Sequence, residues 1–187
     1  MFRGGFLLLS LASLVFADPS LPTVDRRSPP HSITTPLAGE RAEAEARLRS
    51  RVPGARVDYD LLRGGASYVR ALGGTLSGPG GRGRGISLQS VDALPSDEPY
   101  KPVKAFLDEH PGLFGHGSDL LAGRAPVRAS LLSDGLGQSV AWDQRVDGIP
   151  VLEAILIGHL TRGEELLSIA SSFVPDAEGL AQARLYW

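Results

Sequence analysis

The chain has 187 residues, a formal net charge of −2 and a hydrophobic content of 42%. It contains no cysteine and no asparagine, which excludes disulfides, thiolate metal sites, a cysteine nucleophile and N-linked glycosylation. The balanced charge gives no bulk electrostatic reason to expect nucleic-acid binding, and the hydrophobic content argues against a wholly disordered chain. The length allows one modest domain with additional segments.

The N-terminal residues have the pattern of a secretory signal peptide. Arg3 supplies a positive charge, a mostly apolar run covers residues 6–16, and Ala17 precedes Asp18 at the expected cleavage point. The run is too short for a lone membrane-spanning helix, which needs about 20 apolar residues. A buried N-terminal helix is the alternative. We expect a secreted, periplasmic or extracellular protein with no stable membrane span.

The sequence patterns between residues 18 and 72 are weaker predictors of structure. Residues 18–38 are rich in Pro, Ser and Thr without an apolar period, and predict a disordered linker. Residues 39–51 favour a helix whose apolar positions are mostly alanine, so we expect it to bury little surface. Alternating apolar residues predict strands at 56–61 and 67–72.

A glycine-rich segment, SGPGGRGRG, occupies residues 77–85. It lacks the GK[ST] ending of a phosphate-binding P-loop, and no convincing helix follows it. We therefore expect a flexible surface loop. Contact of Arg82 and Arg84 with an anion is the alternative.

The clearest helical pattern covers residues 101–114. Val103, Phe106 and Leu107 stand at i, i+3 and i+4, which gives the helix one apolar face. Pro111 predicts a break near residue 110, because proline clashes with the preceding turn.

After residue 125 the apolar period changes to two. This predicts strands at residues 127–132, 140–146, 149–161 and 166–173. Asp147 and Gly148 form a strong hairpin signal, because both positions tolerate positive φ. Apolar residues on both faces of the strand at 149–161 predict that it is covered on both sides. The predicted fold class is α+β: a helix followed by an antiparallel β-meander, with a disordered N-terminal segment.

Gln144 shares a strand face with Trp142 and should therefore be buried. A buried amide needs hydrogen-bond partners. We expect Gln144 to tie the meander to a neighbouring backbone, and a contact with a partner protein is the alternative.

No arrangement of residues in the sequence predicts an active site. The motifs H-E-x-x-H and G-x-S-x-G are both absent. Asp108 and Glu109 fall on the polar side of the predicted helix, where we expect them to be solvated. Surface or turn positions are expected for the four histidines, His31, His110, His116 and His159.

Residues 140–151, VAWDQRVDGIPV, are the most specific stretch of the chain. A strand ending in His-Leu and a glycine turn follow at residues 156–164, and Phe-Val-Pro-Asp stands at 173–176. Together with the helix at 105–110 and the Leu-Phe-Gly at 113–115, these segments resemble the fungalysin/thermolysin propeptide (FTP) family. The residues that carry the resemblance are Phe106, Leu107, Phe114, Trp142, Gln144, Gly148, Pro150, Val151, His159, Gly163, Pro175 and Asp176.

The resemblance implies a non-catalytic pro-region of a secreted, fungalysin-like zinc metallopeptidase precursor. Such a region acts as an intramolecular chaperone and as a protease inhibitor. Its partner is the cognate catalytic domain in cis, with no nucleic acid involved. Zinc is expected only in that downstream domain, and no cofactor in this chain. The expected organisation is a signal peptide (1–17), a linker (18–38), a weakly defined region (39–99), an FTP-like domain (100–176) and the truncated start of a further segment (177–187).

Two other functions are compatible with the sequence. The first is a free-standing exported module that uses the same β-sheet to bind another protein or an envelope polymer and has no protease as its partner. The second, a small hydrolase, needs His110, His116 and His159 to work together with acidic residues. The resemblance favours the pro-region over both, and it predicts that the chain is a fragment of a longer precursor.

Overall fold

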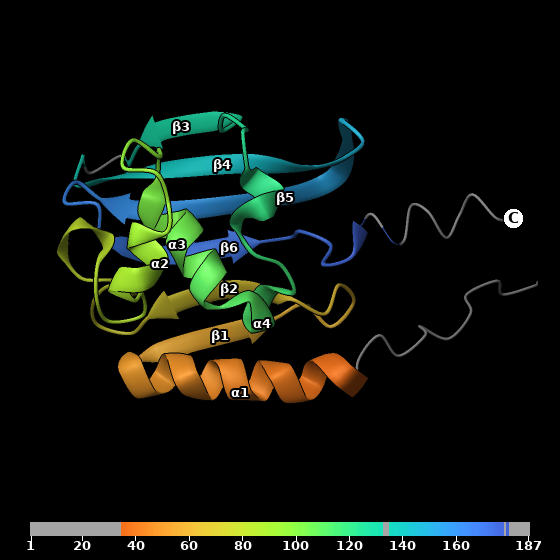
Figure 1. Cartoon of the computed structure of the whole chain (residues 1–187), viewed down its shortest axis with the longest axis horizontal. Coiled ribbons are helices and arrows are strands. Elements are labelled where there is room, and N and C mark those ends of the chain that lie inside the picture. Colours follow the sequence, from red (N-terminus) through yellow and green to blue (C-terminus); the bar gives the residue numbers. More distant parts are fainter. Residues whose placement is uncertain (1–34, 133–134, 178, 180–187) are drawn as a thin grey trace, which may run out of the picture. The chain divides into compact units, whose positions relative to one another are not determined.

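The computed structural model describes residues 35–132, 135–177 and 179 (Figure 1). The predicted signal peptide, its cleavage point between Ala17 and Asp18, and most of the predicted linker lie outside the described residues, as does most of the segment 177–187. Within the described part, helices combine with a six-stranded antiparallel sheet. The predicted α+β class is confirmed.

Most of the helices are short. They are α1 (Thr35–Arg51), α2 (Leu88–Asp92), α3 (Lys101–Glu109) and α4 (Pro111–Phe114), with the 3₁₀ turns η1 (Pro79–Gly81) and η2 (Ser118–Leu121). The strands are β1 (Ala55–Tyr59), β2 (Ala66–Ala71), β3 (Arg128–Leu131), β4 (Gly137–Val146), β5 (Ile149–Thr161) and β6 (Leu166–Ser171). Among the described helices, none is long and apolar enough to cross a membrane.

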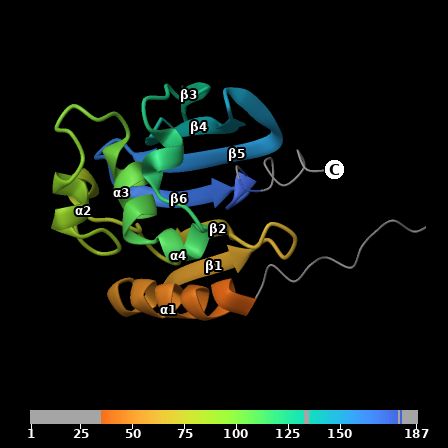
Figure 2. The same ribbon diagram turned by 45° about the vertical axis from the view of Figure 1, so that its right-hand side comes forward.

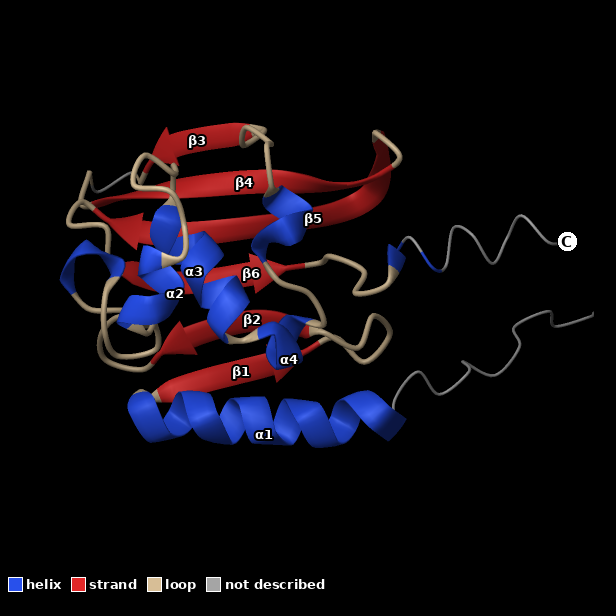
Figure 3. Ribbon diagram, viewed as in Figure 1, coloured by secondary structure: helices blue, strands red, loops and turns tan. Residues whose placement is uncertain are grey.

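The strand order in the sheet is β1-β2-β6-β5-β4-β3, and every neighbouring pair is antiparallel. β2 pairs with β6, with Val69 opposite Ile169, so residues 39–99 and 100–176 contribute to one sheet and one core. Helices α2, α3 and α4 lie on the same side of the sheet in two views, and α1 runs beside β1 (Figures 2 and 3). In the described part of the chain, no helix lies over the opposite side.

The first helix differs from its prediction in start and in burial. α1 begins at Thr35, inside the range 18–38 that was predicted to be disordered. Ala44, Leu48 and Val52 are at most 1% exposed and belong to the core. Because these three residues are spaced by four, they form one narrow apolar stripe along α1 and the residue that follows it. A small number of apolar residues is therefore enough to anchor α1.

The segment SGPGGRGRG is a surface loop only in part: Pro79, Gly80, Arg82 and Arg84 are exposed, as predicted, but its other residues are mostly packed. Ser77 is fully buried, and its hydroxyl accepts a hydrogen bond from the Leu166 amide at 2.8 Å. A Cβ added at Gly81 would lie 2.3 Å from Pro102 Cγ, and Gly85 is buried as well. Glycines at these positions let the backbone approach its neighbours closely. The segment thereby joins the start of β6 to the start of α3.

β5 is not covered on both sides, contrary to the prediction. Leu156 and Leu160 are buried in the core, whereas Leu152 is 87% and Ile155 is 38% exposed. The β4–β5 register shifts near the hairpin, and Glu153 has a φ of 58° there. Such a bulge changes which residues face the core. The apolar side chains that suggested a second covered face instead lie on the uncovered side or near the hairpin tip.

Gly158 provides the space in which α3 packs on β5. A Cβ at this position would lie 2.6 Å from Val103 Cγ2, and Val103 is fully buried. We expect Gly158→Ala to lower the free energy of unfolding by about 1–3 kcal/mol through overpacking. Urea unfolding measures this value, and Gly163→Ala is the matched control, because its Cβ meets only Thr161 Oγ1 at 3.7 Å. Equal stability of the two variants would contradict this account.

Candidate functional site

The residues singled out from the sequence fall into two groups. Five of them are at most 2% exposed: Phe106, Leu107, Phe114, Trp142 and Gln144. Pro175 and Asp176 follow β6 and line a cavity beside Gln144. The structure does not bring the other residues to this cavity. Gly148, Pro150 and Val151 lie in or near the turn of the β4–β5 hairpin. His159 lies on the uncovered face of the sheet, and Gly163 lies in the β5–β6 turn.

Gln144 joins β4 to the chain that follows β6. Its Nε2 donates a hydrogen bond to the Val174 carbonyl oxygen, and its Oε1 accepts one from the Val174 amide, both at 2.8 Å. A single backbone residue thus satisfies both ends of a side chain that is 2% exposed. The predicted tie to a neighbouring backbone is confirmed.

A series of neighbouring aromatic rings connects α3 to the segment that follows β6. The Phe114 ring lies 6.4 Å from the Phe106 ring and 5.9 Å from the His116 ring, measured between centroids. His116 in turn lies 5.5 Å from the Phe173 ring. Aromatic pairs at these distances add stability beyond the burial of their area. Together with Gln144, this series of rings fixes the path of the backbone after β6.

Trp142 contributes packing to the core. Its ring meets Tyr100 edge to face, with centroids 5.7 Å apart, and it is 1% exposed. The buried Nε1 has no hydrogen-bond partner among the described residues. Since an unpartnered donor costs free energy, the benefit of Trp142 comes from the apolar area that it buries.

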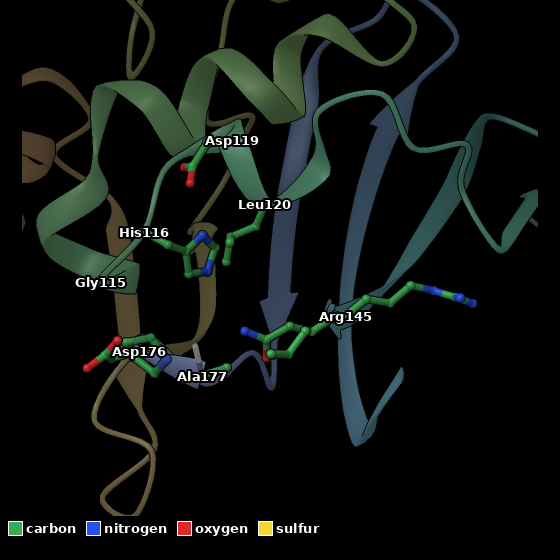
Figure 4. A pocket seen from close by; sticks show the side chains of 10 residues that line it. Gly115, His116, Asp119, Leu120, Arg145, Asp176 and Ala177 are labelled. Carbon is green, nitrogen blue, oxygen red and sulfur yellow. The ribbon is translucent and has the colours of Figure 1, made fainter. Parts of the chain in front are cut away.

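A cavity of about 230 Å³ opens between η2, β4 and the segment after β6 (Figure 4). Its titratable lining residues include His116, Asp119 and Asp176. Arg145 also borders the cavity, but its side chain extends away from it in Figure 4 and pairs with Asp143 at 2.9 Å. The cavity therefore presents carboxylates and an imidazole, without a facing guanidinium.

Two histidines lie in turns between short helices, which is one of the two predicted positions, but they are buried rather than at the surface. His110 is 3% and His116 is 9% exposed, and burial lowers the pKa of both below the usual value of 6.5. His110 Nε2 lies 2.7 Å from the Gly85 carbonyl oxygen, and His116 Nδ1 lies 2.9 Å from the Gly117 carbonyl oxygen. These nitrogens donate their protons, so each neutral ring keeps its other nitrogen as an acceptor. Nowhere in the described ranges do three or more His, Cys, Asp or Glu side chains gather so as to hold a metal ion.

Glu109 is bonded rather than solvated, which corrects another prediction. It accepts hydrogen bonds from the Ser87 hydroxyl at 2.5 Å and from the Ser90 hydroxyl, and it pairs with Arg51. Burial raises the pKa of Glu109, but the hydrogen bonds from these three residues outweigh burial and hold it at about 2. Asp108 is exposed, as predicted, and accepts two hydrogen bonds from Ser118 at the start of η2. Glu109 therefore holds α1, α2 and α3 together. The only hint of this contact in the sequence was the pair Ser87 and Ser90, three residues apart.

Acid should destabilise the fold in two steps. Since the folded-state pKa of His110 and His116 is lowered, their contribution is complete above pH 6.5 and is lost as the pH falls below that value. The contribution of Glu109 is complete above pH 4.5 and is lost as the pH falls toward about 2. Urea unfolding measured from pH 8 down to pH 3 tests both steps.

Glu109→Gln isolates the second step. We expect it to cost about 2 kcal/mol at neutral pH and to flatten the pH dependence below pH 4.5. The exposed Glu43 provides the control, because Glu43→Gln should leave the curve unchanged. A Glu109→Gln variant that keeps the full loss of stability in acid would rule out this role.

Comparison with known proteins gives one similarity. Over 86 residues the chain is 35% identical to the thermolysins of Alicyclobacillus acidocaldarius subsp. acidocaldarius, Bacillus caldolyticus and Bacillus sp. (strain EA1). The matched stretch covers 44% of this chain and 15% of each thermolysin. No family model and no solved structure matches the chain. The chain is thus similar to a minor part of thermolysin, which relates it to thermolysin-type metallopeptidase precursors.

Proposed function

We propose that this chain is the pro-region of a secreted zinc metallopeptidase, and that it assists folding of the catalytic domain and inhibits it. The main observation behind this proposal is the 35% identity to thermolysins over 86 residues. These residues make up only 15% of each thermolysin. Such a restricted match, together with the FTP-like hairpin around Gln144, fits a pro-region better than a protease domain. Export through residues 1–17, with cleavage after Ala17, belongs to the same proposal.

The proposed role needs a rigid binding surface. A protein that binds only the native state of a partner stabilises that state by mass action. Covalent linkage in one precursor raises the effective concentration of the two domains to about the millimolar range. Weak contacts between the pro-region and the catalytic domain are then sufficient for both assistance and inhibition. The zinc ion belongs to the catalytic domain in this proposal, and no residue of this chain is assigned to it.

The coding sequence beyond residue 187 is the first test. We expect it to continue in frame into a domain with an H-E-x-x-H motif, the usual zinc site of such peptidases. Unrelated sequence there would argue for the free-standing exported binding module instead.

A refolding assay is the second test. The denatured catalytic domain is diluted into buffer with or without this chain, and both the recovered activity and its inhibition by excess chain are measured. We expect a several-fold higher yield of active protease when excess chain is removed afterwards, and inhibition when it is not. An equimolar amount of the Phe106→Ala variant, which has a weakened core, controls for unspecific effects. No binding between chain and protease would overturn the proposed function.

A further inference from the structure

The uncovered face of the sheet carries a continuous row of polar side chains. Directly paired residues of antiparallel strands project to the same side of a sheet. Following the pairings from β1 to β3 gives one residue from each strand. This polar row consists of Arg56, Arg70, Ser168, His159, Ser139 and Ser130.

A second row lies next to it on the same face. It consists of Asp58, Tyr68, Ala170, Ile157, Ala141 and Arg128. The core cluster of the protein includes none of these six residues, because it lies on the other side of the sheet. Alanine and serine occupy most of the middle of both rows, so a partner can approach the sheet closely there. Figures 1 and 2 show that α2, α3 and α4 all lie on the opposite side.

The charges of the two rows are unbalanced. Their one carboxylate, Asp58, pairs with Arg56 at 3.1 Å, and the nearby Asp143 of β4 pairs with Arg145 at 2.9 Å. In the part of the chain that the structure describes, no carboxylate pairs with Arg70 or with Arg128. Among the described residues, Arg70 and Arg128 are therefore the two arginines of these rows without a carboxylate partner.

Arg70 also has unused hydrogen-bonding capacity. Its Nε is buried and has no acceptor among the described residues. Its guanidinium carbon lies 5.9 Å from the centroid of the Tyr68 ring, which holds the side chain along the sheet. A guanidinium forms strong paired hydrogen bonds with a carboxylate. A partner that supplies a carboxylate here would pair with the guanidinium group of Arg70.

We propose that the uncovered face is the surface on which an acidic patch of the metallopeptidase domain docks. Arg70 and Arg128 pair with carboxylates of that patch, while the hydroxyl groups of Ser139 and Ser130, which are not buried, donate hydrogen bonds between them. This inference rests on the proposed function, because it names the contact surface for that partner. The charge complementarity is what selects an acidic occupant over a neutral or basic one.

The test is the affinity of this chain for the metallopeptidase domain of the same precursor, measured by isothermal titration at low and at high salt. Arg70→Ser and Arg128→Ser should each weaken binding about tenfold, as loss of one charge-assisted contact does. The affinity of the wild-type chain should fall as salt screens these charges. Arg47→Ser, which removes an exposed arginine of α1 on a different part of the surface, is the matched control and should change the affinity by less than about twofold.

The outcomes separate the two proposals. If the wild-type chain binds and neither Arg70→Ser nor Arg128→Ser weakens binding, the docking surface is wrong and the pro-region function stands. If the wild-type chain does not bind, the pro-region function is wrong, and this docking surface is overturned with it. Thermal melting of each variant checks folding. Arg128 is exposed on the edge strand β3, so its variant tests the surface even if Arg70→Ser fails to fold.

Discussion

Replacing Gln144 with leucine should lower the free energy of unfolding by about 2–5 kcal/mol, because two partly buried backbone groups of Val174 lose their partners. Leucine has a similar volume and leaves no large cavity, so the loss reports the hydrogen bonds. Urea unfolding gives the value. Amide hydrogen exchange at Val174 locates the effect, and it should become much faster in the variant.

Gln89→Leu is the control for this prediction. Gln89 is exposed in α2, unlike Gln144. We expect its replacement to change stability by less than about 0.5 kcal/mol. Unchanged exchange at Val174 in the Gln144→Leu protein would show that the tie does not hold the segment after β6.

Replacing Phe106 with alanine should cost about 3–5 kcal/mol, the usual range for removing a buried aromatic side chain. Phe106 is fully buried, contacts His110 with ring centroids 4.6 Å apart, and lies against the glycine-rich segment near Gly85. The cavity left behind would loosen α3 and that segment together. Thermal and urea unfolding measure the loss.

Leu88→Ala separates this effect from a general effect of truncation. Leu88 is 58% exposed in α2, so its replacement should cost less than about 1 kcal/mol. Similar losses in both variants would contradict the central position of Phe106. Under the proposed function, Phe106→Ala should also weaken inhibition of the protease, because the binding surface requires the folded sheet.

Local patterns in the sequence were sufficient for several elements. Pro111 ends α3 at Glu109, as the clash of proline with the preceding turn requires. Asp147 and Gly148 form the predicted hairpin with φ values of 50° and 79°. β5 has the predicted bounds, Ile149–Thr161. These features depend on neighbouring residues alone, so a single sequence is enough to predict them.

Side-chain partners far apart in the chain were not predictable in the same way. Glu109 bonds Ser87 and Arg51, and Ser77 bonds Leu166, although nothing in the local sequence links these residues. The prediction for Gln144 succeeded because burial followed from strand alternation, and a buried amide must be bonded. Its partner, Val174, came only from the structure.

The sequence by itself determined the fold class, the main helix, the hairpin and the resemblance that leads to the proposed function, because periodicity and turn chemistry act over a few residues. The tertiary structure alone decided that β1 and β2 join β6 in one sheet, and that the glycine-rich segment is packed in part. It also decided which face of the sheet stays uncovered, with Arg70 and Arg128 lacking carboxylate partners among the described residues. Strand order and face assignment depend on long-range pairing and on the shift of register in β5, which local sequence patterns do not encode.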